Sequence, residues 1–333
     1  KIEKLSDYRP KAITKFVADD GTLIGKYWDE DGYRIPAKFN DIPQQLKNAF
    51  LAAEDANFYK HPGIDLVSIA RAAYKNFQAH SSKQGASTIT QQIVKSLLLT
   101  REKTYERKLK EAILSYKIEK YLTKDEIFAV YLNEIFLGSN AYGVKAASWS
   151  HFRKELSQLT LAEMAFLAGL PPKPSYLANP ANRKEADERK RYVLNQMHEN
   201  KMISLQEKQD AEKMEIVVYP PDLQNIYEAP YYMAQVRLDL DEKLQQIDRT
   251  WAAGNPGGFI VHTEVNVSAY KMAEQAVRRG LREIDRRRGW RGPIGKVTGL
   301  NGENLEDKFK EDVRELKVGE IYRAEVVEVN QKT

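Results

Sequence analysis

The chain has 333 residues, of which 42% are hydrophobic and 30% charged, and a formal net charge of +5. Its length predicts about two domains with separate cores, while its ordinary composition argues against disorder and its modest charge does not call for a nucleic-acid partner. The lack of cysteine excludes disulfides, thiolate nucleophiles and sulfur-ligated metals. No apolar run approaches the roughly 18 residues that span a bilayer. Because the chain starts with Lys1 rather than Met, we expect that an upstream segment has been removed.

The residues before position 40 predict a small β segment. Turn signals at Asp19-Asp20-Gly21 and Asp31-Gly32 separate short apolar runs, so Phe16-Val17 and Leu23-Ile24 are predicted to be strands. We therefore expect a small β region ahead of the first helix.

The first helix is predicted to begin at Asp41, which can cap it, with Pro43 in its first turn. Apolar residues recur at helical spacing through Ala53, so Glu54 and Asp55 fall at its C-terminal end. Negative charge is unfavourable at that end of the helix dipole. Two acids there suggest a functional role, although a solvated acid at a helix end is the alternative for Glu54.

The run from Gly85 to Gln92 combines small, hydroxyl and amide side chains at a predicted helix start. Thr88 and Gln91 form a capping-box pattern, and a buried stripe follows at Ile89, Ile93 and Leu97. The free N–H groups of a first helical turn favour anions. We interpret the run as a polar binding wall, and a decorated helix start is the alternative.

The next helix is predicted from about Thr104 to Leu122. The residues expected to face the core are Leu109, Ala112, Ile113 and Tyr116. Arg107 and Glu111 lie four apart and share the opposite face. The polar run is thus flanked in the sequence by Glu54 before it and Glu111 after it.

Two further capping boxes begin later helices. Thr123-x-x-Glu126 opens a helix that is predicted to end at Gly138, and Thr160-x-x-Glu163 opens one that ends before Pro171. Amphipathic helices are also expected near 185–201 and 205–214. Most of the chain between 41 and 214 is therefore predicted to be helical.

A change in composition from Val217 to Pro221 marks the end of the helical part. Beyond it, strands are predicted at 258–265 and 318–329, and a helix at 269–284. The predicted domains are the β segment (1–40), the helical domain (41–220), a linker (221–258) and a C-terminal portion (259–333).

The acids and the polar run together suggest the chemistry of glycosyl transfer. A shielded carboxylate can act as a base toward a sugar hydroxyl, and a second acid near cations can organise a phosphate or a metal ion. A bound phosphate needs hydrogen-bond donors and positive charge. The candidates for that task are Ser87, Gln91, Gln92, Lys95, Arg107 and Lys110. The five histidines show no spacing typical of metal ligands.

Other residues near these positions have simpler interpretations. His61 is expected to fix the loop around it rather than to catalyse a reaction. Tyr131 and Leu132 are expected in the core, and Asn133 is expected to be a hydrogen-bonding strut. Glu163 is either a site residue or only a helix cap.

Five blocks of residues follow one another in order between residues 53 and 180. They are Glu54-Asp55 with Phe58, His61 and Gly63; Gly85 to Gln92; Arg107-Lys108 with Glu111; Glu126-Ile127 with Tyr131-Leu132-Asn133 and Gly138; and Glu163 through Pro171. Together they resemble the peptidoglycan glycosyltransferase module of class A penicillin-binding proteins. The resemblance implies a mainly α fold, with a lysozyme-like helical glycosyltransferase domain, a small β segment before it and an α+β, OB-like C-terminal portion.

The resemblance also implies processive polymerisation of lipid II into β-1,4 glycan strands. Glu54 would take the proton from the 4-hydroxyl of the acceptor N-acetylglucosamine. The oxygen would attack C1 of the donor N-acetylmuramyl sugar with inversion, releasing undecaprenyl pyrophosphate. Glu111 would support the pyrophosphate, directly or through a divalent cation (Mg²⁺ or Mn²⁺), and no organic cofactor is implied. The substrate-binding residues implied in the same way are Asp55, Ser87, Thr90, Gln91, Gln92, Lys95, Lys103, Arg107 and Lys110. At the position of Lys103, relatives often carry arginine.

A second resemblance, to the linker and opening of a penicillin-binding transpeptidase, is carried by residues 228–232, 273–276, 280–281 and 285–293. Residues 290–333 resemble the start of an OB-like domain that many Gram-negative relatives insert there. The transpeptidase itself is missing, and the parent protein is expected to be bifunctional. Ser268 and Lys271 match a bare Ser-x-x-Lys pattern, which we interpret as chance because no Ser-x-Asn or Lys-Thr-Gly element accompanies it.

The first resemblance further implies a location and partners. It places the protein in the bacterial inner membrane, anchored by a single N-terminal helix outside this sequence, with the catalytic domains facing the periplasm. The implied partners are lipid II, the growing glycan strand and other cell-wall synthesis proteins, and no nucleic acid. Apolar residues at 64–67 or around Phe77 are candidates for contact with the membrane surface, and core packing is the alternative for most of them.

Two other functions are compatible with parts of the sequence. A muramidase-like hydrolase would share the fold and use a single glutamate, but attack by water does not need the basic, amide-rich stretch from Gly85 to Glu111. A noncatalytic cell-wall scaffold gives no reason for both Glu54 and Glu111. Polymerisation of lipid II is therefore the preferred prediction.

Overall fold

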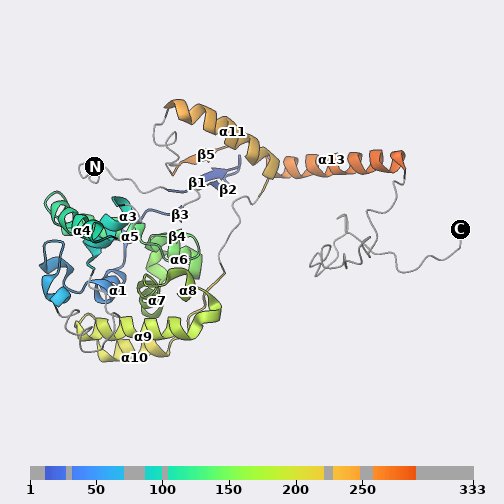
Figure 1. Cartoon of the computed structure of the whole chain (residues 1–333). Helices are drawn as coiled ribbons and strands as arrows, with labels where there is room; N and C mark the ends of the chain where they lie inside the picture. The colour runs from blue at the N-terminus through green and yellow to red at the C-terminus, as the bar shows by residue number, and fades with distance from the viewer. Residues whose placement is uncertain are drawn as a thin grey trace, which may run out of the picture. The chain divides into compact units, whose positions relative to one another are not determined.

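The computed structural model describes residues 12–27, 32–70, 87–99, 104–220, 228–247 and 258–289. The chain divides into two compact units, Lys1–Ser268 and Ala269–Thr333. The first unit holds a helical domain and two small sheets (Figure 1). The described part of the second unit is one helix, α13 (Val267–Arg288), whose apolar side chains Met272, Val277 and Leu281 are exposed.

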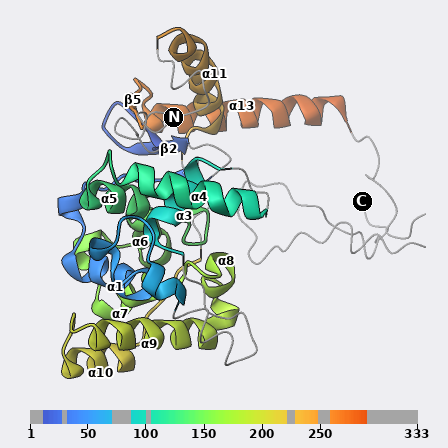
Figure 2. The same cartoon turned by 60° about the vertical axis from the view of Figure 1, so that its left-hand side comes forward.

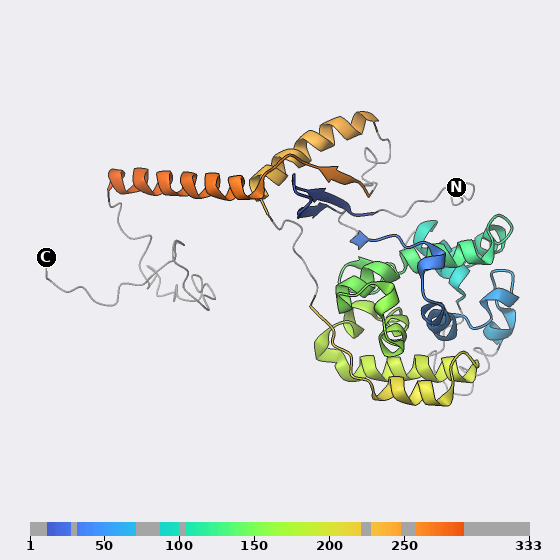
Figure 3. The same ribbon diagram turned by 180° about the vertical axis from the view of Figure 1, so that it is seen from behind.

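The predicted N-terminal strands form a hairpin. Strand β1 (Thr14–Val17) pairs antiparallel with β2 (Leu23–Tyr27) around the predicted turn. On its other edge, β1 pairs in parallel with β5 (Ile260–His262), as Figure 3 shows. A chain segment that follows the helical domain in sequence therefore completes the sheet that begins before it. A second, two-stranded sheet joins β3 (Tyr33–Arg34) to β4 (Ala141–Tyr142).

The rest of the first unit is mainly helical, so the predicted fold class is confirmed. The main helices are α1 (Gln44–Glu54), α3 (Ile89–Leu97), α4 (Tyr105–Ile118), α5 (Lys124–Glu134), α6 (Val144–Phe152), α7 (Leu161–Gly169), α8 (Pro174–Leu177), α9 (Arg183–Glu199), α10 (Leu205–Lys213) and α11 (Pro230–Ile247). The three predicted capping boxes, which begin at Thr88, Thr123 and Thr160, are all present. In each one, the N-cap hydroxyl and the side chain three residues later satisfy backbone N–H groups that have no partner within the helix.

The core of the helical domain is built around α7. This helix is apolar on nearly every side, and it packs against both α1 and α9. Helix α10 lies beside α9, as Figure 2 shows. Phe50 of α1 meets Tyr131 of α5 edge to face, with ring centroids 6.1 Å apart. Each fully buried large apolar side chain of this kind contributes about 1.5–3 kcal/mol to folding.

Several predicted helix boundaries are wrong, including the end of α4, which comes at Ile118 rather than at Leu122. Helix α1 begins at Gln44 with Pro43 at its N-cap, and Asp41 instead ends a separate 3₁₀ turn. Helix α5 ends at Glu134 rather than at Gly138. Gly138 has a φ of +82°, and a Cβ there would lie 2.7 Å from the carbonyl oxygen of Pro174. Glycine is therefore needed in the turn after the helix rather than at the end of the helix.

The predicted orientation of α4 is also wrong. Leu109, Ile113 and Tyr116 were expected in the core, but they are 63%, 49% and 48% exposed. The buried face instead carries Glu111, Ser115 and Ile118, and Ala112 is half-buried. The helical spacing shows which residues form the apolar stripe of α4, but not whether this stripe faces the core or the solvent. The polar Glu111 is tolerated inside because two cations bond to it.

Several predictions concern the C-terminal part. Helix α11 lies within 221–258, where a linker is predicted, and α13 begins slightly before its predicted start at 269. The strand predicted at 318–329 and the OB-like portion lie outside the described residues. In the part of the chain that the structure describes, no helix has both the length and the apolar composition needed to cross a bilayer.

Candidate active site

A cavity of about 370 Å³ brings together residues from α1, α3, α4 and the segment after α7. Its lining residues are Glu54, Ser87, Gln91, Gln92, Lys95, Arg107, Lys108, Glu111, Pro171 and Pro172. The two acids that flank the polar run in sequence therefore share one cavity with the described end of that run. Gly85 and Ala86, which begin the run, lie outside the described residues.

Glu54 is the last residue of α1 and is half-buried at the cavity wall. The side-chain amide of Gln92 donates a hydrogen bond to Glu54 Oε2 at 2.7 Å. Burial raises the pKa of Glu54 above its ordinary value. The hydrogen bond from Gln92 and the positive charge of Arg189 oppose this rise, and the charge of Asp55 adds to it. A carboxylate with a raised pKa is suited to accept a proton from a hydroxyl group.

Asp55 connects the end of α1 to the beginning of α3. Its carboxylate lies 3.0 Å from His61 Nε2 and accepts a hydrogen bond from the backbone N–H of Ile89 at 3.1 Å. Asp55 is buried and is not among the residues that line the cavity. These contacts fix the position of Glu54 relative to Gln92. They also place His61 in the loop-fixing position that the sequence predicts.

Glu111 is 2% exposed, and both of its carboxylate oxygens are bonded by cations of the same helix. Arg107 Nη1 donates to Oε2 at 3.3 Å, and Lys108 Nζ donates to Oε1. Lys108 Nζ also donates to Ser87 Oγ at 3.2 Å. Arg107 and Lys108, together with Lys95, place three cations around the buried acid Glu111. We call these three cations the cationic wall, and their charge is suited to bind an anionic group.

Asp55, Thr90 and Lys110, which are predicted to bind substrate, do not line the cavity. Thr90 is fully buried, and its hydroxyl donates to Glu119 Oε1 at 2.6 Å. Lys110 is exposed and forms an ion pair with Glu106 at 2.6 Å. Lys103 lies outside the described residues. Glu163 caps α7 and pairs with Lys154 at 2.7 Å, so it has the capping role that the sequence left open.

The sequence interpretation did not select four residues at or near the site. Lys108, Pro171 and Pro172 line the cavity, and Arg189 of α9 acts electrostatically on Glu54. Lys108 could have been found, because a lysine three residues before Glu111 lies on the same helix face. Nothing in the local sequence connects Arg189 to Glu54, since only the packing of α9 against α1 brings them near each other.

The residues of the cavity do not fit a resident divalent cation. Glu54 and Glu111 are the acids that line it, and both oxygens of Glu111 already accept hydrogen bonds from cations. Across the described ranges, no group of three or more His, Asp or Glu side chains is placed to hold a metal ion. A divalent cation at Glu111 would lie against the positive charges of Arg107 and Lys108, which oppose its binding, so we derive no step through one.

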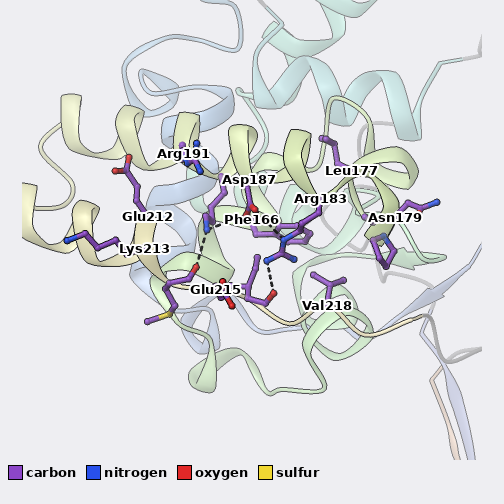
Figure 4. A pocket seen from close by; sticks show the side chains of 15 residues that line it. Phe166, Leu177, Asn179, Arg183, Asp187, Arg191, Glu212, Lys213, Glu215 and Val218 are labelled. Atoms are coloured by element: carbon purple, nitrogen blue, oxygen red, sulfur yellow. Dashed lines mark hydrogen bonds and ion pairs between the residues drawn. The ribbon is translucent and has the colours of Figure 1, made fainter.

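A larger cavity, of about 550 Å³, lies between α7, α8, α9 and residues 212–218 (Figure 4). Two of its cations are bonded to the backbone. Arg183 Nη2 donates to the carbonyl of Ile216 at 2.6 Å, and Lys190 Nζ donates to that of Met214 at 3.1 Å. These bonds hold the chain after α10 against α9. The cavity includes neither Glu54 nor Glu111, so the smaller cavity is the candidate active site.

The fold and the site define a helical enzyme with a carboxylate suited to act as a base and a cationic wall suited to an anionic group. A family model described as a transglycosylase matches residues 20–198. This match covers more than half of the chain, and the chain belongs to the transglycosylase family.

Similar proteins are penicillin-binding proteins 1A. The protein of that name from Rickettsia felis is 40% identical over 316 residues, covering 94% of this chain and 38% of the relative. The one from Neisseria meningitidis is 38% identical over 333 residues, covering 99% and 41%. A crystal structure of penicillin-binding protein 1A from Haemophilus influenzae matches with 27% identity and a TM-score of 0.46, covering 91% of this chain and 34% of that one. The chain thus spans about two fifths of the length of these curated relatives.

Proposed function

We propose that the chain is a peptidoglycan glycosyltransferase that polymerises lipid II in cell-wall synthesis. The observation that supports this most directly is the presence of Glu54, with its raised pKa, in one cavity with Lys95, Arg107 and Lys108. Transfer of a sugar from a diphosphate needs a base for the acceptor hydroxyl and positive charge for the leaving group. The cavity offers both.

In the proposed reaction, a carboxylate oxygen of Glu54 takes the proton from the 4-hydroxyl of the acceptor N-acetylglucosamine. The acceptor oxygen forms a bond to C1 of the donor N-acetylmuramyl sugar. The bond from C1 to the phosphate oxygen breaks, and its electron pair leaves with undecaprenyl pyrophosphate. Attack from the face opposite the leaving group inverts C1 and gives a β-1,4 link. Glu54 then returns its proton to solvent.

The cationic wall is proposed to hold the diphosphate. Arg107 and Lys108 are fixed by Glu111, and Lys108 is also bonded to Ser87. Cations held in place before the reaction stabilise developing negative charge without a cost of reorganisation at the moment of reaction. In this proposal Glu111 is a positioning residue, because it acts on the diphosphate through its two cations.

The outward face of α4 supports a position at a membrane surface, where a lipid substrate would lie. Its exposed apolar residues are accompanied by the exposed lysines Lys110, Lys117 and Lys120. Leu66 and Val67, which the sequence nominated for such a contact, are 73% and 65% exposed. Apolar side chains beside lysines are typical of surfaces that bind anionic lipid. We propose that the domain works on the periplasmic side of the inner membrane, and that a bifunctional parent protein also carries the transpeptidase.

Incubation with labelled lipid II in detergent tests the proposed activity. Long glycan chains should form with the unchanged protein and with Glu188→Gln, an exposed acid of α9. They should not form with Glu54→Gln, which has nearly the same shape but cannot take the proton. Shortening of preformed glycan would instead assign a hydrolase. If the protein neither polymerises lipid II nor shortens preformed glycan, the result would assign a noncatalytic scaffold.

A further inference from the structure

The larger cavity (Figure 4) takes no part in the proposed reaction. Its volume of about 550 Å³ lies within the range of roughly 300–1,000 Å³ that is typical of ligand pockets. Part of its lining is apolar and includes Phe166, Leu177, Ile216 and Val218. The cavity therefore has the size and the apolar surface that a ligand site requires.

The polar side of this cavity is built by helix α9. Arg183, Asp187 and Lys190 line it at helical spacing, so their side chains share one face of the helix. Asp187 Oδ2 pairs with Arg183 Nε and Asp187 Oδ1 pairs with Lys190 Nζ, each at 3.4 Å. The charge of Asp187 is therefore compensated by two cations.

Two buried polar atoms on this side keep unused hydrogen-bonding capacity. Asp187 Oδ1 is buried and accepts no hydrogen bond within the part of the chain that the structure describes. Lys190 is 3% exposed, and one of the three N–H donors of its ammonium group bonds to the carbonyl of Met214 at 3.1 Å. Among the described residues, this is the hydrogen bond that the ammonium group makes. Buried polar groups are usually hydrogen-bonded, so a ligand that bonds to both atoms would gain affinity.

A hydroxyl group is the ligand group that fits both atoms. It carries one donor, which Asp187 Oδ1 can accept, and two acceptor sites, of which Lys190 Nζ can use one. Because the two atoms lie 3.4 Å apart, one hydroxyl oxygen can reach both at ordinary hydrogen-bond lengths. An anion brings no donor for Asp187, and a cation brings no acceptor for Lys190. A saccharide combines hydroxyl groups with C–H faces that can pack against the apolar lining.

The segment from Phe166 to Pro180 borders both cavities. Phe166 and Pro180 line the larger one. Pro171 and Pro172, which lie between them in the sequence, line the one that contains Glu54. The two cavities thus belong to one domain and share a short stretch of chain. The saccharide nearest to hand for the larger cavity is therefore the glycan strand that the smaller one is proposed to make.

We propose that the larger cavity is a second saccharide site, which holds part of the glycan strand through hydroxyl groups bonded to Asp187 and Lys190. The choice of the glycan strand as the saccharide rests on the proposed function. A strand held at a second point stays with the enzyme between successive additions, because its return to the catalytic cavity becomes an intramolecular event. The site therefore favours long products.

Nuclear magnetic resonance of the isotope-labelled protein tests the proposal by titration. The probes are the β-1,4-linked disaccharide of N-acetylglucosamine, inorganic phosphate and the neutral peptide N-acetyl-alanyl-alanine amide. We expect the disaccharide to shift the backbone amide signals of Ile216 and Val218 with a Kd of about 1 mM. The other two probes should leave these signals unchanged. The signals of Gln91 and Gln92 report separately on binding at the smaller cavity.

Two variants test the two sides of the larger cavity. Asp187→Leu removes the acceptor, and Val218→Phe fills part of the cavity. Asp210→Leu, which replaces an exposed acid of α10, is the control. We expect the first two variants to bind the disaccharide more weakly by about tenfold or more, and the control to bind like wild type. With labelled lipid II, the first two should also give shorter glycan chains at the wild-type initial rate of lipid II consumption.

Unshifted signals of Ile216 and Val218 in the presence of the disaccharide would overturn the proposal. Shifts of these signals by phosphate or by the peptide would assign an anion site or a peptide site instead. Wild-type binding in folded Asp187→Leu and Val218→Phe proteins would also overturn it. If neither variant folds, the wild-type titration with its two control probes decides between the proposal and these alternatives. A wild-type protein that binds the disaccharide at this cavity but makes no glycan would refute the proposed function while confirming the saccharide site, so the two failures are distinct.

Discussion

The side-chain amide of Gln92 donates a hydrogen bond to Glu54 Oε2 at 2.7 Å and so joins the first turns of α3 to the last residue of α1. A donor to a carboxylate stabilises its charged form. The polar run after Gly85 therefore contributes more than an anion-binding wall. Its last residue also orients the proposed base.

The Gln92→Ala variant should lose activity most strongly at low pH. The hydrogen bond lowers the pKa of Glu54, so its removal leaves the effect of burial less opposed and the pKa rises further. A base with a higher pKa is protonated over more of the acidic range. We expect a loss of about tenfold or more at pH 6 and a smaller loss at pH 9, measured with labelled lipid II. Gln206→Ala, an exposed amide on α10, is the control, and a loss that is independent of pH would contradict this role.

The Glu111→Gln variant should nearly abolish turnover without unfolding the protein. A neutral amide no longer holds Arg107 and Lys108 in place by charge, so the cations proposed to bind the diphosphate lose their fixed geometry. The expected loss is about 100-fold or more in rate, with an unchanged circular dichroism spectrum. Glu106→Gln, which breaks an exposed ion pair on the same helix, should keep nearly full activity. Wild-type rates in Glu111→Gln would remove this residue from the site.

Substitution of Asp55 separates positioning from direct binding of substrate. Asp55 is buried and bonded to His61 and Ile89, so Asp55→Ala should lower both the melting temperature and the activity. Loss of a buried hydrogen-bond acceptor leaves its donors without a partner and costs about 1–3 kcal/mol. Glu54→Gln, next to it, should lower activity with little change in melting temperature. An Asp55→Ala protein with wild-type stability would favour the substrate-binding role that the sequence suggests.

The exposed face of α4 predicts opposite results for two isoleucines on one helix. Ile113→Ser should change the free energy of unfolding by less than about 0.5 kcal/mol, because Ile113 is 49% exposed. Ile118→Ser should cost about 2–4 kcal/mol, because Ile118 is buried. Urea denaturation measures both.

Flotation with anionic liposomes tests the same face for membrane binding. The unchanged protein should float with the vesicles, and Leu109→Asp with Ile113→Asp should reduce the floating fraction. A wild-type protein that stays wholly in the aqueous fraction would refute the membrane proposal. It would not contradict the finding that this face of α4 is exposed.

His151 predicts a loss of stability in mild acid. It is buried, its Nε2 donates to the carbonyl of Leu137 at 2.8 Å, and burial lowers its pKa from 6.5 to about 4. The unfolded chain therefore binds this proton below about pH 6.5, and the folded chain binds it only near pH 4. The free energy of unfolding should fall as the pH drops through this range, by about 3 kcal/mol at most, and be unaffected above it.

Urea denaturation at pH 7 and pH 5 measures this effect. His151→Leu should show a smaller difference between the two pH values than wild type, whereas His198→Leu, which replaces a half-buried histidine, should behave like wild type. Identical differences in all three proteins would show that His151 does not contribute to the pH dependence.

The local patterns of the sequence were sufficient to predict many of the helices of the helical domain. Side chains at N-caps act on backbone groups only three residues away, so Thr88, Thr123 and Thr160 marked helix starts correctly. The position of Glu54 at the end of a helix also followed from local spacing. Helix α11 lies where the sequence predicts a linker, although its first residue, Pro230, suits a first helical turn.

Relations between distant residues were decided by tertiary packing. The apolar stripe of α4 is visible in the sequence, but a stripe fits a core or an exposed surface equally well. Only the packing of α4 against α3, with Glu111, Ser115 and Ile118 buried, fixes the rotation of the helix. The pairing of β1 with β5 and the charge of Arg189 near Glu54 likewise depend on segments far apart in the chain. The sequence by itself thus determined the candidate base, the second acid and most of the helices, because these follow from local spacing and residue chemistry. The surroundings that set the charge and position of the base come from other helices, so only the tertiary structure decided them.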